Sequence, residues 1–171
     1  MTNSEGKIHN IKNLEEKICR EIEKLFWIDL HNESNSKLRT YKLIKNSYQC
    51  ENYIKMNAPA KYIKALAKIR LSDHELEIER GRYHTPKTPL QERKCQYCNT
   101  LEDEKHFLLE CENYRTERET MNKSITHTKI PEQRDSGEKM SMLLNPKCEK
   151  SLKAVAKYII LCKKVRLAPA T

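Results

Sequence analysis

Apolar residues recur every three or four positions near the start of the chain, which is the spacing of one face of an α-helix. The stripe consists of Ile11, Leu14, Ile18, Ile22, Leu25 and Phe26. It predicts an amphipathic helix over about residues 10–30. The polar run at 31–36 that follows predicts a linker.

The same periodicity predicts three further helices. One begins at Ser36, a suitable N-cap, and continues to about Tyr48. The next opens at Pro59, because proline is tolerated in the first turn, and runs to Arg70. The last starts at Lys147. Its predicted apolar side comprises Leu152, Val155, Ala156, Ile159, Cys162 and Val165.

Two segments lack this helical spacing. Residues 76–78 alternate apolar and charged side chains, which predicts a short extended piece. Residues 126–145 include a proline, a serine and a glycine, so we expect a loop or a flexible insert there.

Three cysteines and a histidine lie within seventeen residues at zinc-ligand spacing. They are Cys95, Cys98, His106 and Cys111. Zinc prefers four tetrahedral thiolate or imidazole ligands, and the Cys-x2-Cys pair suits a tight turn on one side of the ion. The His-x4-Cys pair would close the other side, so the pattern predicts one structural Zn²⁺ with no position open for catalysis. The alternative is a chance grouping of reduced side chains.

The residues beside these four carry further expectations. Thr100 to Asp103 resemble a capping box, and the acids at 102–104 suit a helix N-terminus. His106 and Cys111 are five residues apart, about 140° around an ideal helix, so we expect the helix to break or tighten near Cys111, or to start late. Phe107 and Leu108 should supply the small core under the ion. His84 could compete as a ligand, with a loop histidine as the alternative.

Few glycines and the helical spacings favour a mostly α fold, a small helical domain with an embedded Cys-Cys-His-Cys zinc module. We divide the chain into three parts. Residues 1–36 form the N-terminal amphipathic helix and linker; 37–125 form a basic helical segment plus the zinc module; 126–171 form a loop and a basic helix that packs on the same domain.

Cysteine usage and the N-terminal residues favour an intracellular protein of the nucleus or cytoplasm. The seven cysteines are an odd number, so they cannot form a fully paired disulfide framework. The polar first residues lack the apolar core of a signal peptide, and no apolar run reaches membrane-spanning length. We therefore expect no membrane partner.

The net charge of +9 is unevenly distributed. Residues 37–72 carry +8 and residues 112–171 carry +6, whereas residues 73–111 carry −3. Clustered positive charge binds phosphate backbones, although a solvated lysine face is the alternative. The predicted phosphate contacts are Arg80, Arg82, Arg93 and Lys94. Arg80 and Arg82 could instead pair with Glu77 or Glu79.

Tyrosines and lysines alternate between residues 41 and 64. The tyrosines are Tyr41, Tyr48, Tyr53 and Tyr62. They could stack on bases while the lysines contact phosphates. They could also place their rings in the core and their hydroxyls at its rim, which is the interpretation we favour.

Several motifs together resemble a known family. They are the stretch 69–84, Glu92-Arg93-Lys94-Cys95, and Glu102-Asp103-Glu104-Lys105-His106-Phe107-Leu108-Leu109-Glu110-Cys111. They look like the zinc-binding region that follows the reverse transcriptase in LINE-type non-LTR retrotransposons. The resemblance extends from about Lys37 to Ile159. It implies a region that assists the polymerase by gripping template RNA or target DNA, and it carries ligand roles onto the four zinc residues only.

The catalytic signatures of such elements are missing. The chain has no Asp-Asp dipeptide for polymerase metals, and Pro131 is followed by Glu132 where a nuclease needs aspartate. We therefore predict a non-catalytic, zinc-stabilised nucleic-acid-binding module that contacts RNA or DNA mainly through the backbone. The alternative is a protein-interaction or scaffold fragment that docks a polymerase or another protein through its amphipathic helices, the N-terminal one above all.

Overall fold

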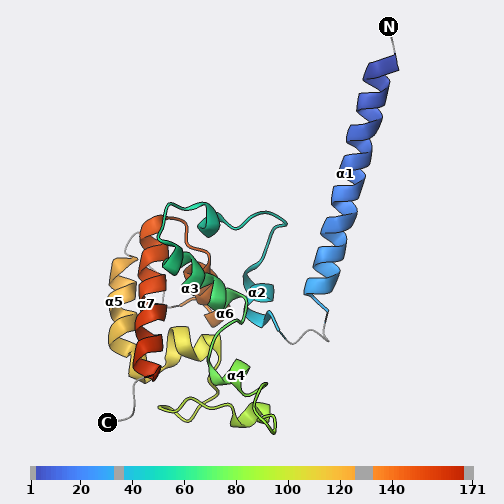
Figure 1. Ribbon diagram of the computed structural model, residues 1–171. Coiled ribbons are helices and arrows are strands. Elements are labelled where there is room, and N and C mark those ends of the chain that lie inside the picture. The colour runs from blue at the N-terminus through green and yellow to red at the C-terminus, as the bar shows by residue number, and fades with distance from the viewer. Residues whose placement is uncertain (1–2, 33–36, 126–132, 168–171) are drawn as a thin grey trace. The chain divides into compact units, whose positions relative to one another are not determined.

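The computed structural model describes residues 3–32, 37–125 and 133–167, with side chains for those between 11 and 166. The chain divides into two units, Met1–Leu38 and Arg39–Thr171 (Figure 1). Within the described residues the structure is helical, and its only β-like feature is an isolated antiparallel bridge between Lys94 and Leu101. The predicted mostly α fold with an embedded Cys-Cys-His-Cys group is confirmed.

The described residues of the first unit form one helix, α1 (Asn3–Leu30), which begins earlier than the predicted 10–30. Its apolar stripe is exposed from Ile11, at 56%, to Leu25, at 64%, while Phe26 is half-buried. Its charged groups pair over short spacings, as in Arg20–Glu16 at 3.0 Å. Most of the predicted linker, residues 33–36, lies outside the described residues.

The second unit contains six α-helices among its described residues. They are α2 (Arg39–Ile44), α3 (Ala60–Arg70), α4 (Glu77–Arg80), α5 (Arg115–Ser124), α6 (Ser136–Leu144) and α7 (Glu149–Leu167). Short 3₁₀ turns occupy 52–55, 90–92 and 112–114, and a π-helix spans His106–Glu110.

Helix α7 is the centre of this unit because α3 and α5 both pack against it (Figure 1). Its predicted apolar side is buried, with Leu152 and Val155 fully enclosed. Val165 is the exception on this side, at 37% exposed. Val165 lies in the last turn of α7. The buried residue in this turn is its neighbour Arg166, which pairs with Glu102.

Three local predictions differ from the structure. Helix α6 lies inside the predicted loop, because Asp135 caps it through a 2.9 Å bond from the Glu138 backbone N–H and its apolar residues are buried. Helix α4 replaces the expected extended segment, with Ile78 buried within it. Helix α2 ends at Ile44, short of the predicted Tyr48.

No described helix combines the length and the apolar character that crossing a membrane requires.

Candidate metal centre

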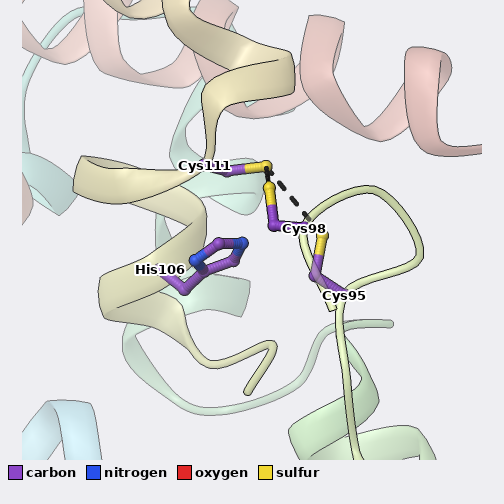
Figure 2. A group of neighbouring side chains, drawn as sticks. All are labelled: Cys95, Cys98, His106 and Cys111. Carbon is purple, nitrogen blue, oxygen red and sulfur yellow. Dashed lines mark hydrogen bonds between the residues drawn. The ribbon is translucent and has the colours of Figure 1, made fainter. Parts of the chain in front are cut away.

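Four side chains converge on one point of the second unit (Figure 2). They are Cys95, Cys98, His106 and Cys111, together the Cys–His cluster, and their ligand atoms all lie within 4.8 Å of one another. Cys111 Sγ is 3.6 Å from Cys98 Sγ and 3.9 Å from Cys95 Sγ. Thiolates bound tetrahedrally at about 2.3 Å from an ion lie about 3.8 Å apart, whereas disulfide sulfurs lie about 2.05 Å apart. The spacing is therefore that of metal ligands.

His106 has one ring nitrogen available as a metal ligand. Its Nδ1 lies 3.2 Å from the Thr100 hydroxyl, while its buried Nε2 has no hydrogen-bond partner among the described residues. A metal-bound histidine typically donates its other ring N–H to a nearby oxygen, which fixes the tautomer. A buried nitrogen without a partner is costly unless something binds it. The ring turns a nitrogen toward the sulfurs (Figure 2), so the cluster fits a metal ion.

The first two ligands lie on a tight knuckle. The Cys95 backbone N–H donates to the Thr100 carbonyl at 2.7 Å, and the Asn99 N–H donates back to the Cys95 carbonyl at 3.0 Å. Asn99 adopts a positive φ of 55°, a conformation that asparagine tolerates better than most residues. This turn places both sulfurs of the Cys-x2-Cys pair on one side of the cluster.

The other two ligands are brought together by a π-helix. The Cys111 N–H donates to the His106 carbonyl at 2.8 Å, a bond between residues five apart. We expected the helix to break, tighten or start late, because five residues do not share a face of an α-helix. The structure widens the helix over His106–Glu110, which was not expected, and the five-residue bond sets His106 and Cys111 side by side. Cys111 is then the C-cap and a 3₁₀ turn follows it, so the expected break near Cys111 is present.

Phe107 and Leu108 form the floor beside the cluster. Both are buried, and the Phe107 ring packs on Tyr114 and Tyr158 at 5.4 and 5.7 Å between centroids. The Tyr158 hydroxyl also donates to the Phe107 carbonyl at 2.5 Å. The predicted small core beneath the Cys–His cluster is confirmed. It joins residues 94–111, the metal loop, to α7.

The acids between Thr100 and His106 meet the expectation of a helix N-terminus only in part. Asp103 caps the start of the helix, because its Oδ1 accepts the His106 backbone N–H at 2.7 Å. Thr100 faces the His106 ring rather than a backbone N–H, so no capping box of the predicted form is present in this described loop. Glu102 and Glu104 are buried at 1% and 2% exposure. They enter ion pairs, Glu102 with Arg166 and Glu104 with Arg39.

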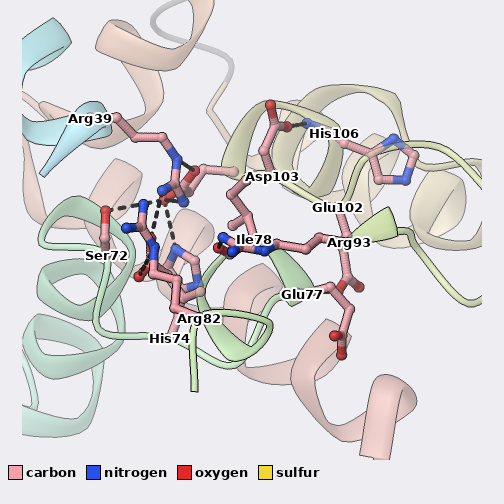
Figure 3. Close-up of polar contacts among 12 residues, drawn as sticks. Arg39, Ser72, His74, Glu77, Ile78, Arg82, Arg93, Glu102, Asp103 and His106 are labelled. Carbon is pink, nitrogen blue, oxygen red and sulfur yellow. Dashed lines mark hydrogen bonds and ion pairs between the residues drawn. The ribbon is translucent and has the colours of Figure 1, made fainter. Parts of the chain in front are cut away.

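Glu104 ties the loop to α2 and to the segment after α3. Arg39 donates to its two oxygens at 2.9 and 2.7 Å, and His74 Nε2 lies 2.7 Å away (Figure 3). Burial alone would raise the pKa of Glu104, but the hydrogen bond and charge of His74 and the charge of Arg39 outweigh it and lower the pKa to about 2. The carboxylate is therefore held ionised.

Glu102 and the knuckle tie the loop to the end of α7. Arg166 donates to both Glu102 oxygens, at 2.9 and 2.8 Å, and these bonds raise its pKa above the ordinary value. Gln96 and Tyr97, which lie between the first two cysteines, donate to the last carbonyls of α7 at 3.2 Å. These bonds satisfy carbonyls that a helix C-terminus otherwise leaves unpaired.

The four predicted phosphate contacts are not equivalent. Arg93 donates to the Thr88 and Ile78 carbonyls at 3.0 and 2.9 Å, so its guanidinium holds the loop together (Figure 3). Arg82 pairs with buried Glu79 at 3.1 Å. Arg80 is 48% exposed and pairs with Glu77 at 3.1 Å. The ion pairs expected as the alternative for these two arginines are therefore present.

The two remaining candidates of the loop face solvent. Lys94, the fourth predicted phosphate contact, is exposed. His84 is exposed and bonds the Thr88 hydroxyl at 2.8 Å, outside the Cys–His cluster. The prediction that all four basic residues contact nucleic acid stays a prediction, and exposure favours Arg80 and Lys94.

The tyrosines between 41 and 62 differ in burial. Tyr53 is buried and its ring lies 4.9 Å from the Arg70 guanidinium, with Tyr41 at 5.8 Å from the same group. Tyr48 is 41% exposed, and Lys61 lies over the Tyr62 ring. Tyr53 therefore belongs to the core, while Tyr41 is half-buried beside Arg70.

No family model, curated protein or solved structure matches this chain. The interpretation of the cluster consequently rests on its own geometry.

Proposed function

We propose that the Cys–His cluster binds one structural Zn²⁺ and that the helical unit around it is a non-catalytic nucleic-acid-binding module. Three thiolates and an imidazole form a donor set that suits zinc. Four protein ligands leave no coordination position for a substrate, so the ion would supply folding energy and no chemistry. We propose the same origin as the resemblance implies, a region that follows the reverse transcriptase of a LINE-type retrotransposon.

The observation that carries the binding proposal is the way the second unit uses its charges. Residues 39–171 contain 27 basic and 17 acidic groups, a net charge of +10. The buried acids around the metal loop are neutralised by internal partners, as Glu102 is by Arg166 and Glu104 by Arg39. The surplus charge therefore lies on exposed lysines, where it can release counterions from a phosphate backbone.

One face of α7 shows this surplus clearly. Lys150, Lys157 and Lys164 are exposed and recur every seven residues, so they form one row with steps of about 10.5 Å. Lys153 lies on the same face and pairs with Glu149 at 3.1 Å. An open groove beside the row is lined by Ser124 of α5 as well as by lysines of this face. We propose this row, with Arg80 and Lys94, as the surface that contacts phosphates.

A salt titration of the zinc-loaded chain tests the proposal. Fluorescence anisotropy with a labelled single-stranded RNA and with a DNA duplex should show binding that weakens steeply with salt, with a log–log slope of about −3 or steeper. RNA or DNA as the preferred partner is read from the same data. A flat salt dependence with retained binding would instead favour the alternative, apolar docking of a protein partner. No binding to either nucleic acid at low salt would exclude the proposal.

Metal identity is tested separately. Native mass spectrometry should find one zinc per chain, and chelation should remove the ion together with the folded structure of the metal loop. We expect the protein to act in the nucleus or cytoplasm, where thiolates stay reduced. A chain that folds and keeps its helicity without any metal would contradict a structural ion.

A further inference from the structure

The exposed stripe of α1 has an internal symmetry that the proposed function does not use. Its central residues are Ile11, Leu14, Ile18, Ile22 and Leu25, all 47–64% exposed. Successive members are separated by three, four, four and three positions, so the spacing is the same in both directions from Ile18. A row of this kind is complementary to a second copy of itself running the opposite way.

We propose that α1 pairs with α1 of a second copy of this chain in an antiparallel arrangement centred on Ile18. In this pairing Ile18 lies against its own counterpart, Ile11 lies against Leu25 of the second copy, and Leu14 lies against Ile22. All five apolar side chains are then covered by apolar side chains. Helices of this size gain most of their stability from burying such a face.

The spacing departs from the alternating steps of three and four that a left-handed coiled coil needs in either direction. Continuing that alternation from Ile11, Leu14 and Ile18 would place Glu21 in the seam. The antiparallel arrangement centred on Ile18 uses Ile22 at this level, so it buries no charged residue among its central positions.

Charge is compatible with self-pairing. Residues 1–38 contain six basic and seven acidic groups, so two copies of this unit repel each other little. Lys17 and Glu21 lie along the same edge of the apolar stripe. A twofold axis at Ile18 places this edge of one helix beside the same edge of the other helix. Lys17 of one copy and Glu21 of the other are then separated by about 3 Å along the helix axis, so opposite charges face each other across the pair.

Sedimentation equilibrium of the full, zinc-loaded chain is the first test. A dimer has twice the monomer mass of 20.3 kDa. Ile18→Asp should weaken association by roughly a hundredfold or more, because it buries a charge at the twofold axis. The matched control is Asn13→Asp, which adds the same charge on the opposite face of α1 and should leave the mass unchanged. A monomer at every concentration, or a dimer that survives Ile18→Asp, would overturn the proposal.

Cross-linking tests the direction. In a background where Cys19, Cys50 and Cys148 are serine, chains with Ile11→Cys are mixed with chains carrying Leu25→Cys. The antiparallel pairing predicts a disulfide between the two kinds of chain and little within either kind. Cross-links of Ile11→Cys chains to one another would show a parallel pair and refute the arrangement. Because neither experiment involves nucleic acid, the outcome is independent of the proposed function.

Discussion

The α1 unit and the second unit satisfy their charged groups in opposite ways. In α1 the pairs are exposed and three or four residues apart, as in Lys24–Glu21 at 2.7 Å. In the second unit Arg166 reaches Glu102, 64 positions away, and both side chains are nearly buried. Short-range pairs add little to stability, whereas a buried pair is costly to break.

Their apolar groups differ in the same sense. The α1 stripe is exposed, while the second unit encloses Leu66, Leu108 and Val155 almost completely. A helix such as α1 follows from periodicity alone. The metal loop follows from contacts among segments distant in the sequence, namely the residues around Arg39, His74 and Arg166. The two regions therefore should respond very differently to the same kind of substitution.

Loss of a metal ligand should give the largest difference. Cys98→Ser removes one of four ligands, and structural zinc can supply on the order of 10 kcal/mol of folding energy in small modules. Amide signals of residues 73–111 should collapse into the unfolded range of an NMR spectrum, while α1 signals stay in place. Cys148→Ser is the control, because Cys148 is exposed and lies outside the cluster. If the amide chemical-shift dispersion of the Cys98→Ser variant were unchanged, the fold would not depend on the metal.

A second difference should appear between buried and exposed ion pairs. Arg166→Met leaves Glu102 without its bidentate partner and should lower the free energy of unfolding by about 3–5 kcal/mol. Arg20→Met removes the exposed partner of Glu16 and should cost about 0–1 kcal/mol. Urea unfolding of both zinc-loaded variants measures the two values. Equal losses of unfolding free energy in the two variants would show that buried and exposed ion pairs contribute equally to the stability of the two regions.

The sequence predicted the parts of the molecule that depend on local patterns. The α1 stripe, the proline opening of α3 and the apolar side of α7 all follow from spacing, and the Cys–His ligands follow from motif spacing. The sequence did not predict what depends on distant partners. Glu104 looks like a helix N-terminal acid until Arg39 and His74 are seen beside it.

The π-helix at the metal loop is a similar case. An ideal α-helix separates His106 from Cys111, and only the requirement that both reach one cluster indicates the wider turn. Helix α6 was also missed, because its glycine and serine obscured the cap at Asp135 and the buried Leu143 and Leu144. Asp135 followed three residues later by Glu138 is the signal that could have revealed it.

The surplus charge of the second unit should be visible in binding. Replacing Lys150, Lys157 and Lys164 by alanine removes the α7 row and should weaken RNA binding roughly tenfold at 0.1 M salt, with a salt slope smaller by about 2–3. The matched control replaces Lys12, Arg20 and Lys24, three cations of α1, by alanine. It should change the affinity far less. Equal effects of the two triple variants would mean that only total charge matters, and that the row is not the contact surface.

The smallest expected effect concerns Arg80, whose pair with Glu77 is of the short-range kind found in α1. Arg80→Ala should change the free energy of unfolding by at most about 0.5 kcal/mol, because the pair is half exposed, yet weaken RNA binding a few-fold. Arg93→Ala is the contrasting variant. It removes the donor to the Ile78 and Thr88 carbonyls and should cost about 1–3 kcal/mol of stability. If Arg80→Ala destabilises as much as Arg93→Ala, the pair is structural, and Arg80 behaves like the long-range contacts of its unit rather than like the pairs of α1.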